Sequence, residues 1–194
     1  YRHGGIPGFP QLSCAAKDAR AFREKLVSVQ GVPDAQVRSL TDAEATREAI
    51  LRELAWLREK AGSGSYAYFF FSGHGTQAQK PGSGDGTTHS GLVPHDFNMA
   101  DYEDGKPTPL VFDHELGAWI ESLSSSGLVA VVDACFCGAI TKGVPAKLRP
   151  RGFFLRPRRG SKSVEWQRGK PVPLNTTRAN CLVIEAAQWD LAAR

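Results

Sequence analysis

The sequence predicts an α/β protein with a mostly parallel central sheet. Two apolar runs, residues 66–72 and 128–133, are rich in aromatic or β-branched side chains and stop abruptly at small or polar residues, which is typical of buried parallel strands. A short strand at residues 37–40 and a helical pattern over residues 42–60 precede the first run. Strand–helix–strand units of this kind almost always take a right-handed parallel crossover. With 194 residues, 41% of them hydrophobic, the chain is long enough for one well-buried domain.

The N-terminal half predicts two helices before the strand at residues 66–72. Residues 15–28 form the first, because apolar side chains recur there at helical spacing. A short strand is expected at residues 37–40. Thr41 and Glu44, three residues apart, form a capping box, which predicts a helix that begins at residue 42 and ends at residue 60.

The remaining elements follow the same patterns. Residues 77–90 are polar and predict a loop, which leads to a short apolar piece at residues 92–93. A helix at residues 112–123 is expected to enter the strand at residues 128–133. Residues 181–186 predict one more buried strand.

Each of the two central strands is followed by a reactive side chain, His74 after the first and Cys135 after the second. The carboxyl ends of parallel strands lie along one edge of a sheet, so these two residues are expected to be neighbours. An imidazole beside a thiol raises the thiolate fraction that acts as a nucleophile. Gly73 and Gly75 let the backbone approach a substrate, and backbone N–H groups there could face a developing oxyanion.

These two blocks resemble the catalytic blocks of caspase-like cysteine proteases. The form D-x-C-x-x-G around the cysteine is similar to that of metacaspases and their bacterial relatives, the orthocaspases, rather than of true caspases. Five blocks carry the resemblance: LSCAAKDA (residues 12–19), FSGHG (71–75), GLVPHD (91–96), DACFCG (133–138) and LVIEAAQ (182–188). The resemblance implies a caspase-like α/β/α sandwich, a single peptidase domain over residues 1–194 from which the first and last strands of the family are expected to be missing.

The resemblance also implies a cysteine endopeptidase and assigns its residues. Cys135 is expected to be the nucleophile and His74 its acid–base partner, with the backbone N–H groups of Gly75 and Cys135 as the oxyanion hole. The primary specificity pocket is expected to contain four side chains: Ala15, Asp18, Ser72 and Asp133. Its two carboxylates predict cleavage after Arg or Lys. Simpler roles exist for both: Asp18 in the first turn of a helix favours the helix dipole, and Asp133 could cap a turn.

Residues 139–180 predict a basic, cleavable loop. Ten Lys and Arg and only one acid, Glu165, lie within residues 142–170, which leaves fourteen basic and nineteen acidic residues elsewhere. Because the positive charge is confined to one Pro- and Gly-containing segment without a platform of stacking aromatics, a solvated loop is favoured over a nucleic-acid site. Loops of this kind concentrate proteolytic nicking, so activation by processing is expected. No apolar run has the length of a membrane helix.

The sequence predicts no required cofactor and no metal site. Calcium remains a candidate activator, as in many metacaspases. However, no EF-hand spacing occurs, and of the family's paired aspartates only Asp113 remains, followed by His114 and Glu115. The other histidines are expected to be surface or loop residues: His3, His89, His95 and His114. Of these, His95 is a candidate metal ligand, but the surface or loop role is strongly favoured. The cysteine spacings favour reduced thiols in a cytoplasm over disulfides or a zinc knuckle.

Two functions of other classes compete with the peptidase. A catalytically silent caspase-like scaffold would keep the fold and bind partners, but both reactive residues are present. A nucleotide-binding doubly wound domain ranks last, because no G-x-G-x-x-G or G-x-x-x-x-G-K motif follows a strand. The expected partners are therefore protein or peptide substrates with Arg or Lys before the cut, in bacterial stress, cell-death or defence signalling.

Overall fold

A computed structural model describes residues 12, 14–79, 88–98, 101–102, 106, 109–134 and 181–185, with the backbone alone at residues 77, 79, 88 and 181–185. The long helices are α1 (Ala15–Ser28), α2 (Arg47–Lys60) and α4 (Asp113–Ser122), with 3₁₀ turns at Asp34–Gln36 and Asp42–Glu44. The strands are β1 (Tyr66–Ser72), β2 (Gly75–Gln79), β3 (Thr88–Leu92), β4 (Val111–Phe112), β5 (Gly127–Asp133) and β6 (Cys181–Glu185).

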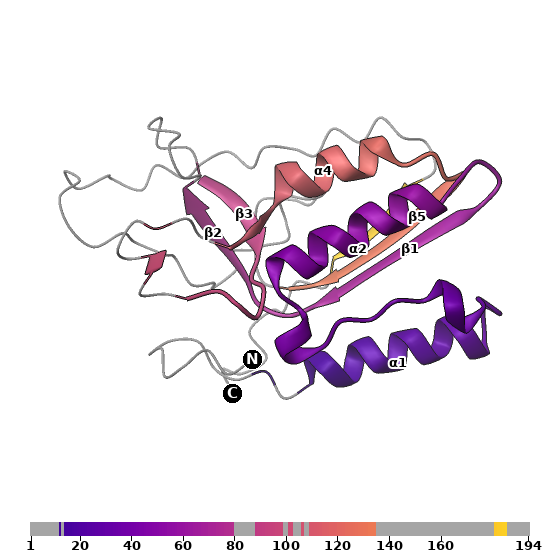
Figure 1. Cartoon of the computed structure of the whole chain (residues 1–194), viewed down its shortest axis with the longest axis horizontal. Coiled ribbons are helices and arrows are strands. Elements are labelled where there is room, and N and C mark those ends of the chain that lie inside the picture. The colour runs from indigo at the N-terminus through magenta and orange to yellow at the C-terminus, as the bar shows by residue number, and fades with distance from the viewer. Residues whose placement is uncertain are drawn as a thin grey trace, which may run out of the picture.

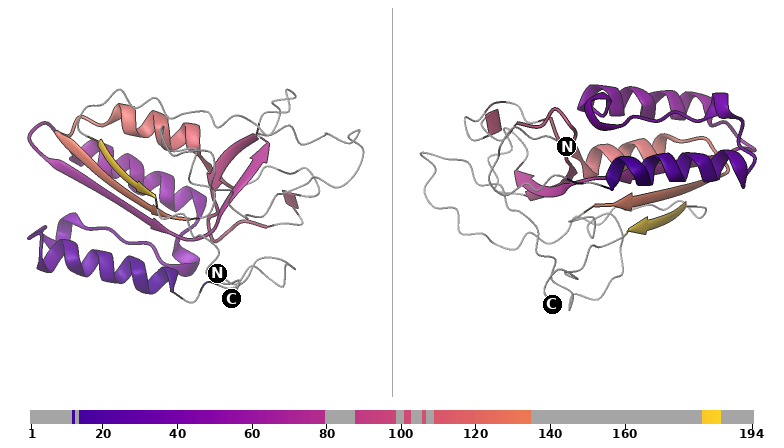
Figure 2. Two further views of the ribbon diagram at one scale, coloured as in Figure 1. Left: turned by 180° about the vertical axis from the view of Figure 1, so that it is seen from behind. Right: turned by 90° about the horizontal axis from the view of Figure 1, so that it is seen from below.

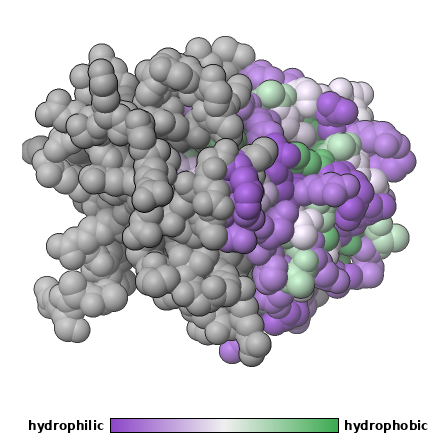
Figure 3. All heavy atoms as spheres, turned by 60° about the vertical axis from the view of Figure 1, so that its left-hand side comes forward, coloured by the Kyte–Doolittle hydropathy of each residue, from purple (hydrophilic) through white to green (hydrophobic). Residues whose placement is uncertain are grey.

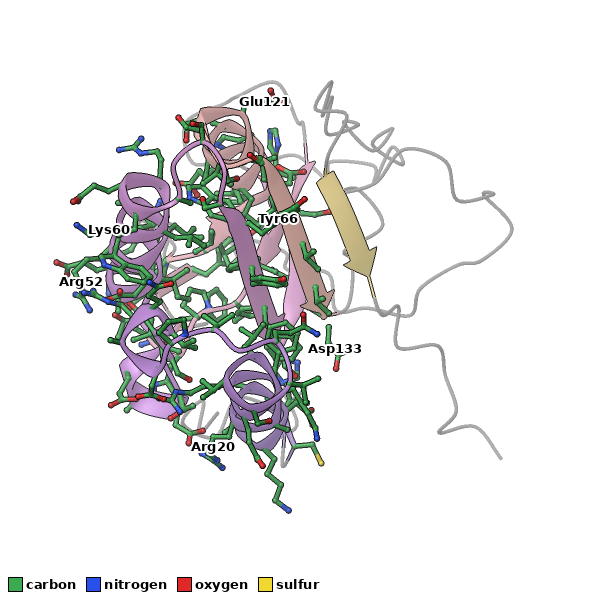
Figure 4. The ribbon with its side chains drawn as sticks, turned by 90° about the vertical axis from the view of Figure 1, so that its right-hand side faces the viewer. Arg20, Arg52, Lys60, Tyr66, Glu121 and Asp133 are labelled. Atoms are coloured by element: carbon green, nitrogen blue, oxygen red, sulfur yellow. The ribbon has the colours of Figure 1, made fainter. Side chains whose placement is uncertain are left out.

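The central sheet has the order β1-β5-β6, and both of its pairings are parallel. Figure 4 shows the three strands side by side in this order, and the left panel of Figure 2 shows them from behind. Helices α2 and α4 lie on one face of the sheet and α1 on the other (Figure 1). The predicted α/β fold with a parallel central sheet and helices on both faces is therefore confirmed.

Side-chain alternation along β1 explains why helices cover both faces. Phe69 contacts Trp119 of α4, with ring centroids 5.6 Å apart, whereas its neighbour Phe70 stacks on Phe22 of α1 at 4.6 Å. Successive strand residues point to opposite faces, so a continuous aromatic run requires an apolar partner on each side. The α2 and α4 side holds the main core, which includes Ile50, Leu54, Phe71, Leu116, Trp119, Leu128 and Val132.

A second, antiparallel sheet with the order β2-β3-β4 begins directly after β1. Gly75 pairs with Leu92, and Ala78 pairs with His89. The prediction of a loop over residues 77–90 was therefore wrong at both of its ends, where β2 and β3 form. The sequence pattern did not indicate these strands, because several of their buried positions hold small or polar residues: Thr76, Ala78 and Ser90.

The segment between α1 and α2 differs from the expectation in two ways. Residues 37–40 are extended but form no strand in the part of the chain that the structure describes. The predicted capping box of Thr41 and Glu44 is present, yet it starts only the short turn Asp42–Glu44. Asp42 has a φ of 49°, which does not continue a helix. Helix α2 starts after Thr46, whose hydroxyl accepts a hydrogen bond from the Ala49 N–H at 3.2 Å.

The other predicted elements are confirmed to within about two residues. Helix α1 and strand β1 have the predicted limits, and α4, β5 and β6 differ from theirs by one residue at one or both ends. The basic loop at residues 139–180 lies outside the described residues, so its predicted exposure and cleavage stay predictions, as does the single-domain assignment.

The described surface carries few large apolar side chains. Val29 and Tyr66 are the exposed large hydrophobic residues of the described part. On the face shown in Figure 3, the described surface is mainly hydrophilic, with small separated apolar areas. Among the described residues, no helix has both the length and the apolar character that crossing a bilayer demands.

Candidate active site

His74 lies in the two-residue step between the two sheets, after Gly73 and immediately before β2. Its side chain is buried, with 5% of the residue exposed. Hydrogen bonds hold the backbone on both sides: the Gly73 N–H donates to the Asp133 carbonyl at 3.0 Å, and the Val93 N–H donates to the His74 carbonyl at 2.9 Å. The histidine is thus anchored to β5 and to the segment after β3.

The register of the parallel pair brings the end of β5 to the same edge. Ser72 is level with Asp133, and neighbouring strands lie about 4.8 Å apart. His74 and Cys135 each follow this pair by two residues. Cys135 lies outside the described residues, but Ala134 before it is described and buried, with 2% exposed. The neighbourhood of thiol and imidazole stays a prediction, which the register supports.

Asp18 and Asp133 form an acidic pair at this edge. Burial raises the pKa of the Asp133 carboxyl, and the negative charge of Asp18 raises it further, so the two carboxylates are close enough to repel each other. Figure 4 shows Asp133 at the end of β5 beside α1, and Tyr66 at the opposite end of the sheet. The structure therefore brings together the two acids that were predicted for one pocket.

Helix and strand periodicities explain why these residues share a face. Phe22 stacks on Phe70, and Asp18 lies one helical turn before Phe22, on the same side of α1. Ser72 lies two residues after Phe70, on the α1 face of β1, and Asp133 is its partner in register. Ala15, one turn before Asp18, is buried. The four residues predicted for the pocket therefore lie on the α1 side of the sheet, at the carboxyl ends of its strands.

Gly75 is placed where its N–H can serve the site. His74 accepts a hydrogen bond from Val93, and in antiparallel pairs hydrogen-bonded positions alternate with non-hydrogen-bonded ones. Gly75, which pairs with Leu92, is therefore a non-hydrogen-bonded position, and its N–H is directed away from β3. That orientation fits an oxyanion donor beside His74.

The family model described as "Metacaspase, peptidase C14 domain" matches residues 3–143, a span that includes His74, Cys135 and the four residues predicted for the pocket. The chain belongs to the metacaspase family. Metacaspase-2 of Trypanosoma brucei brucei is 30% identical over 99 residues, which cover 50% of this chain and 26% of that protein. Metacaspase-3 of the same organism matches to the same extent. This metacaspase chain thus spans about a quarter of the length of these curated relatives.

The fold of this metacaspase chain agrees with its family, which confirms the caspase-like fold class. A solved structure, protein GSU0716 from Geobacter sulfurreducens, aligns with 52% of this chain and 34% of that one, at 19% identity and a TM-score of 0.38.

A second cluster of reactive side chains in this metacaspase lies away from the acidic pair. His89 of β3 and Asp113 and His114 of α4 place one ligand atom each within 4.8 Å of one another. The prediction that His89 is a surface or loop residue was wrong: it belongs to a strand and its side chain is 17% exposed. Sequence reasoning missed the cluster because the hairpin that brings residue 89 to residue 113 was not predicted.

Proposed function

We propose that this metacaspase is a cysteine endopeptidase that uses Cys135 and His74. The main support for this proposal is the register of β1 and β5, which brings His74 and the chain leading to Cys135 to one edge of the sheet. His74 takes the thiol proton as Cys135 sulfur attacks the scissile carbonyl, and the backbone N–H groups of Gly75 and Cys135 stabilise the oxyanion. The imidazolium then protonates the leaving amine, and water hydrolyses the resulting thioester.

The proposed substrate carries Arg or Lys before the cut. A cationic side chain that enters the face between α1 and the ends of β1 and β5 meets both Asp18 and Asp133, whose mutual repulsion it relieves. A guanidinium donates bidentate hydrogen bonds to carboxylates, so arginine is preferred to lysine. Ser72 and Ala15 complete the walls of this pocket. Processing of the basic loop and a reducing, cytoplasmic location in a bacterial stress, death or defence response belong to the same proposal.

Covalent labelling tests this function. A peptidyl electrophile with an arginyl side chain should modify one thiol, Cys135, and the label should be absent from Cys135→Ala and present in Cys137→Ala. A lysyl reagent should react more slowly, and an aspartyl reagent should not react. Equal labelling by arginyl and aspartyl reagents would exclude the acidic pocket, whereas a folded protein with no labelled cysteine would favour a silent scaffold.

A further inference from the structure

The cluster of His89, Asp113 and His114 has the geometry of metal ligands. The Nδ1 atom of His89 lies 3.3 Å from Asp113 Oδ1, and Nδ1 of His114 lies 3.6 Å from the same oxygen. The two imidazole rings are inclined at 66° with centroids 5.0 Å apart. Two ring nitrogens therefore converge on one carboxylate oxygen from different elements of the fold.

The backbone around the cluster holds the carboxylate in place. Asp113 has 5% of its surface exposed. Its Oδ1 accepts a hydrogen bond from the His114 N–H at 2.7 Å, and its Oδ2 accepts one from the Ser90 N–H at 3.3 Å. Phe112 stacks on the His114 ring at 5.6 Å and meets the His89 ring edge-on at 6.2 Å. The rings and the carboxylate are thus positioned by the junction of β3, β4 and α4.

The two nitrogen–oxygen separations fit ligands of one metal ion better than hydrogen bonds between the side chains, whereas the three ligand atoms as a set lie within 4.8 Å of one another and would draw closer around an ion. Charge-assisted N–H···O bonds are about 2.7–2.9 Å long, so 3.3 Å is long and 3.6 Å is not a hydrogen bond. For bonds of about 2.0–2.2 Å to a tetrahedral zinc ion, the edge between two ligand atoms is about 3.3–3.5 Å. Two neutral imidazoles and one carboxylate leave a fourth position for water, and nitrogen ligands suit zinc-class ions.

We propose that His89, Asp113 and His114 bind a zinc-class divalent ion, and that this place does not take calcium. Calcium requires about six to eight oxygen ligands, and here the neighbouring acid is engaged elsewhere. Glu115 Oε1 pairs with the Arg47 guanidinium, and its Oε2 accepts a hydrogen bond from the Phe112 N–H at 2.9 Å. Asp113 therefore provides the carboxylate of the cluster. The other two ligands are imidazole nitrogens, which bind calcium poorly.

The ion would tie β3 to the start of α4 and leave the catalytic edge free. His89 lies three positions before Leu92, which is about 10 Å along β3, and Leu92 pairs with the residue that follows His74. Binding would therefore stiffen the sheet next to the catalytic histidine without supplying a catalytic group. This inference does not depend on the proposed peptidase activity.

Metal titration tests the site in a protein that lacks the thiols of Cys135 and Cys137. In the double variant Cys135→Ala, Cys137→Ala, Co²⁺ should bind one to one and give the visible absorption of a tetrahedral site without thiolate charge-transfer bands. Zn²⁺ should displace the Co²⁺, and millimolar Ca²⁺ should not. His114→Asn in this background should weaken Zn²⁺ binding at least tenfold, and it should still fold because the His114 side chain is 39% exposed.

His95→Asn is the matched control, because His95 lies outside the cluster and should leave the Zn²⁺ affinity within about twofold. His89→Asn supplies a second variant for the cluster, with the melting temperature in the absence of metal as a check of folding. Zn²⁺ affinity that is unchanged in His114→Asn and in folded His89→Asn, an octahedral Co²⁺ spectrum, or displacement of Zn²⁺ by Ca²⁺ would each overturn the proposal.

Discussion

At the scale of single residues, the proposed activity depends on two side chains at the sheet edge. Cys135→Ala should lower kcat/KM at least about a thousandfold, because no other group supplies the nucleophile. His74→Gln should have a similar effect, since glutamine fills the buried site without acting as a base. Peptidase assays on purified variants measure both, with Cys137→Ala as a control that stays within a few-fold of the parent. Near-parental activity in Cys135→Ala would contradict the assignment.

The Asp133 carboxylate is expected to lower the free energy of unfolding while it supports specificity for arginyl substrates. Asp133→Asn removes a carboxylate that burial and Asp18 both disfavour, so the variant should be more stable than the parent at neutral pH. Its kcat/KM on an arginyl substrate should fall roughly tens to thousands of fold, because a charge partner in a partly desolvated pocket is lost. Urea unfolding and kinetics on the same preparation give both values. A variant that loses stability and keeps arginyl cleavage would contradict the assignment of Asp133 to the specificity pocket.

The raised pKa of Asp133 also predicts a pH dependence. The folded state holds this proton more tightly than the unfolded state, so the destabilisation is absent below the ordinary Asp pKa and complete above the raised one. Between these two pKa values, the free energy of unfolding of the parent should fall as the pH rises, when compared with that of Asp133→Asn. An arginyl inhibitor should lower this pKa again and release protons on binding in the same range. Calorimetry in buffers of different ionisation enthalpy measures the release, and none is expected for Asp133→Asn.

At the scale of elements, a buried hydrogen bond links α4 to α2 in addition to apolar packing. Trp119 Nε1 donates to the Leu54 carbonyl at 2.7 Å, and the indole belongs to the main core. Trp119→Phe should reduce the free energy of unfolding by about 1–3 kcal/mol, through lost apolar contact and a lost polar partner. Denaturant unfolding followed by circular dichroism measures it.

Trp56→Phe is the matched control on α2. Trp56 is half-buried, and the Arg38 guanidinium lies 4.3 Å from its ring centroid. Such a contact contributes about 0.5–1 kcal/mol and persists in part with phenylalanine. Equal destabilisation by the two substitutions would show that the Trp119 hydrogen bond does not matter.

Elements with a regular apolar pattern could be predicted from the sequence, and those held by tertiary contacts could not. Helix α1 and strand β1 were predicted at their observed limits because their periodicity is unbroken. Strands β2 and β3 were missed since they bury Thr76 and Ser90 among other small residues. Helix α2 starts later than predicted because Arg47 is fixed there by tertiary partners: its N–H donates to Asp96 at 2.9 Å and its Nε to the Leu110 carbonyl at 3.0 Å.

The acidic pair could be anticipated, whereas the histidine cluster could not. Asp18 and Asp133 follow from helix and strand spacing at one sheet edge together with the family resemblance. His89 reaches Asp113 only through the β2–β3 hairpin and the pairing of β3 with β4. The hairpin has no regular apolar pattern, and β4 is only 2 residues long. Sequence spacing alone separates those residues by more than twenty positions.

At the scale of the whole molecule, the charge distribution predicts self-processing. Basic residues are concentrated within residues 142–170, and an enzyme that cleaves after Arg or Lys finds its own sites there. We expect cleavage between Lys142 and Arg178 in the parent and none in Cys135→Ala. Mass spectrometry of freshly purified protein detects the fragments. An intact segment in fully active enzyme would remove processing as a requirement for activity.

The most direct test of the central claim, that a cysteine peptidase recognises basic residues through Asp18 and Asp133, is an unbiased peptide-library cleavage profile of the purified chain with and without calcium. We expect cleavage after Arg, slower cleavage after Lys and none after Asp, because an acidic side chain would add a third negative charge to the pocket. Cleavage after Asp, or a profile unchanged in Asp133→Asn, would contradict it.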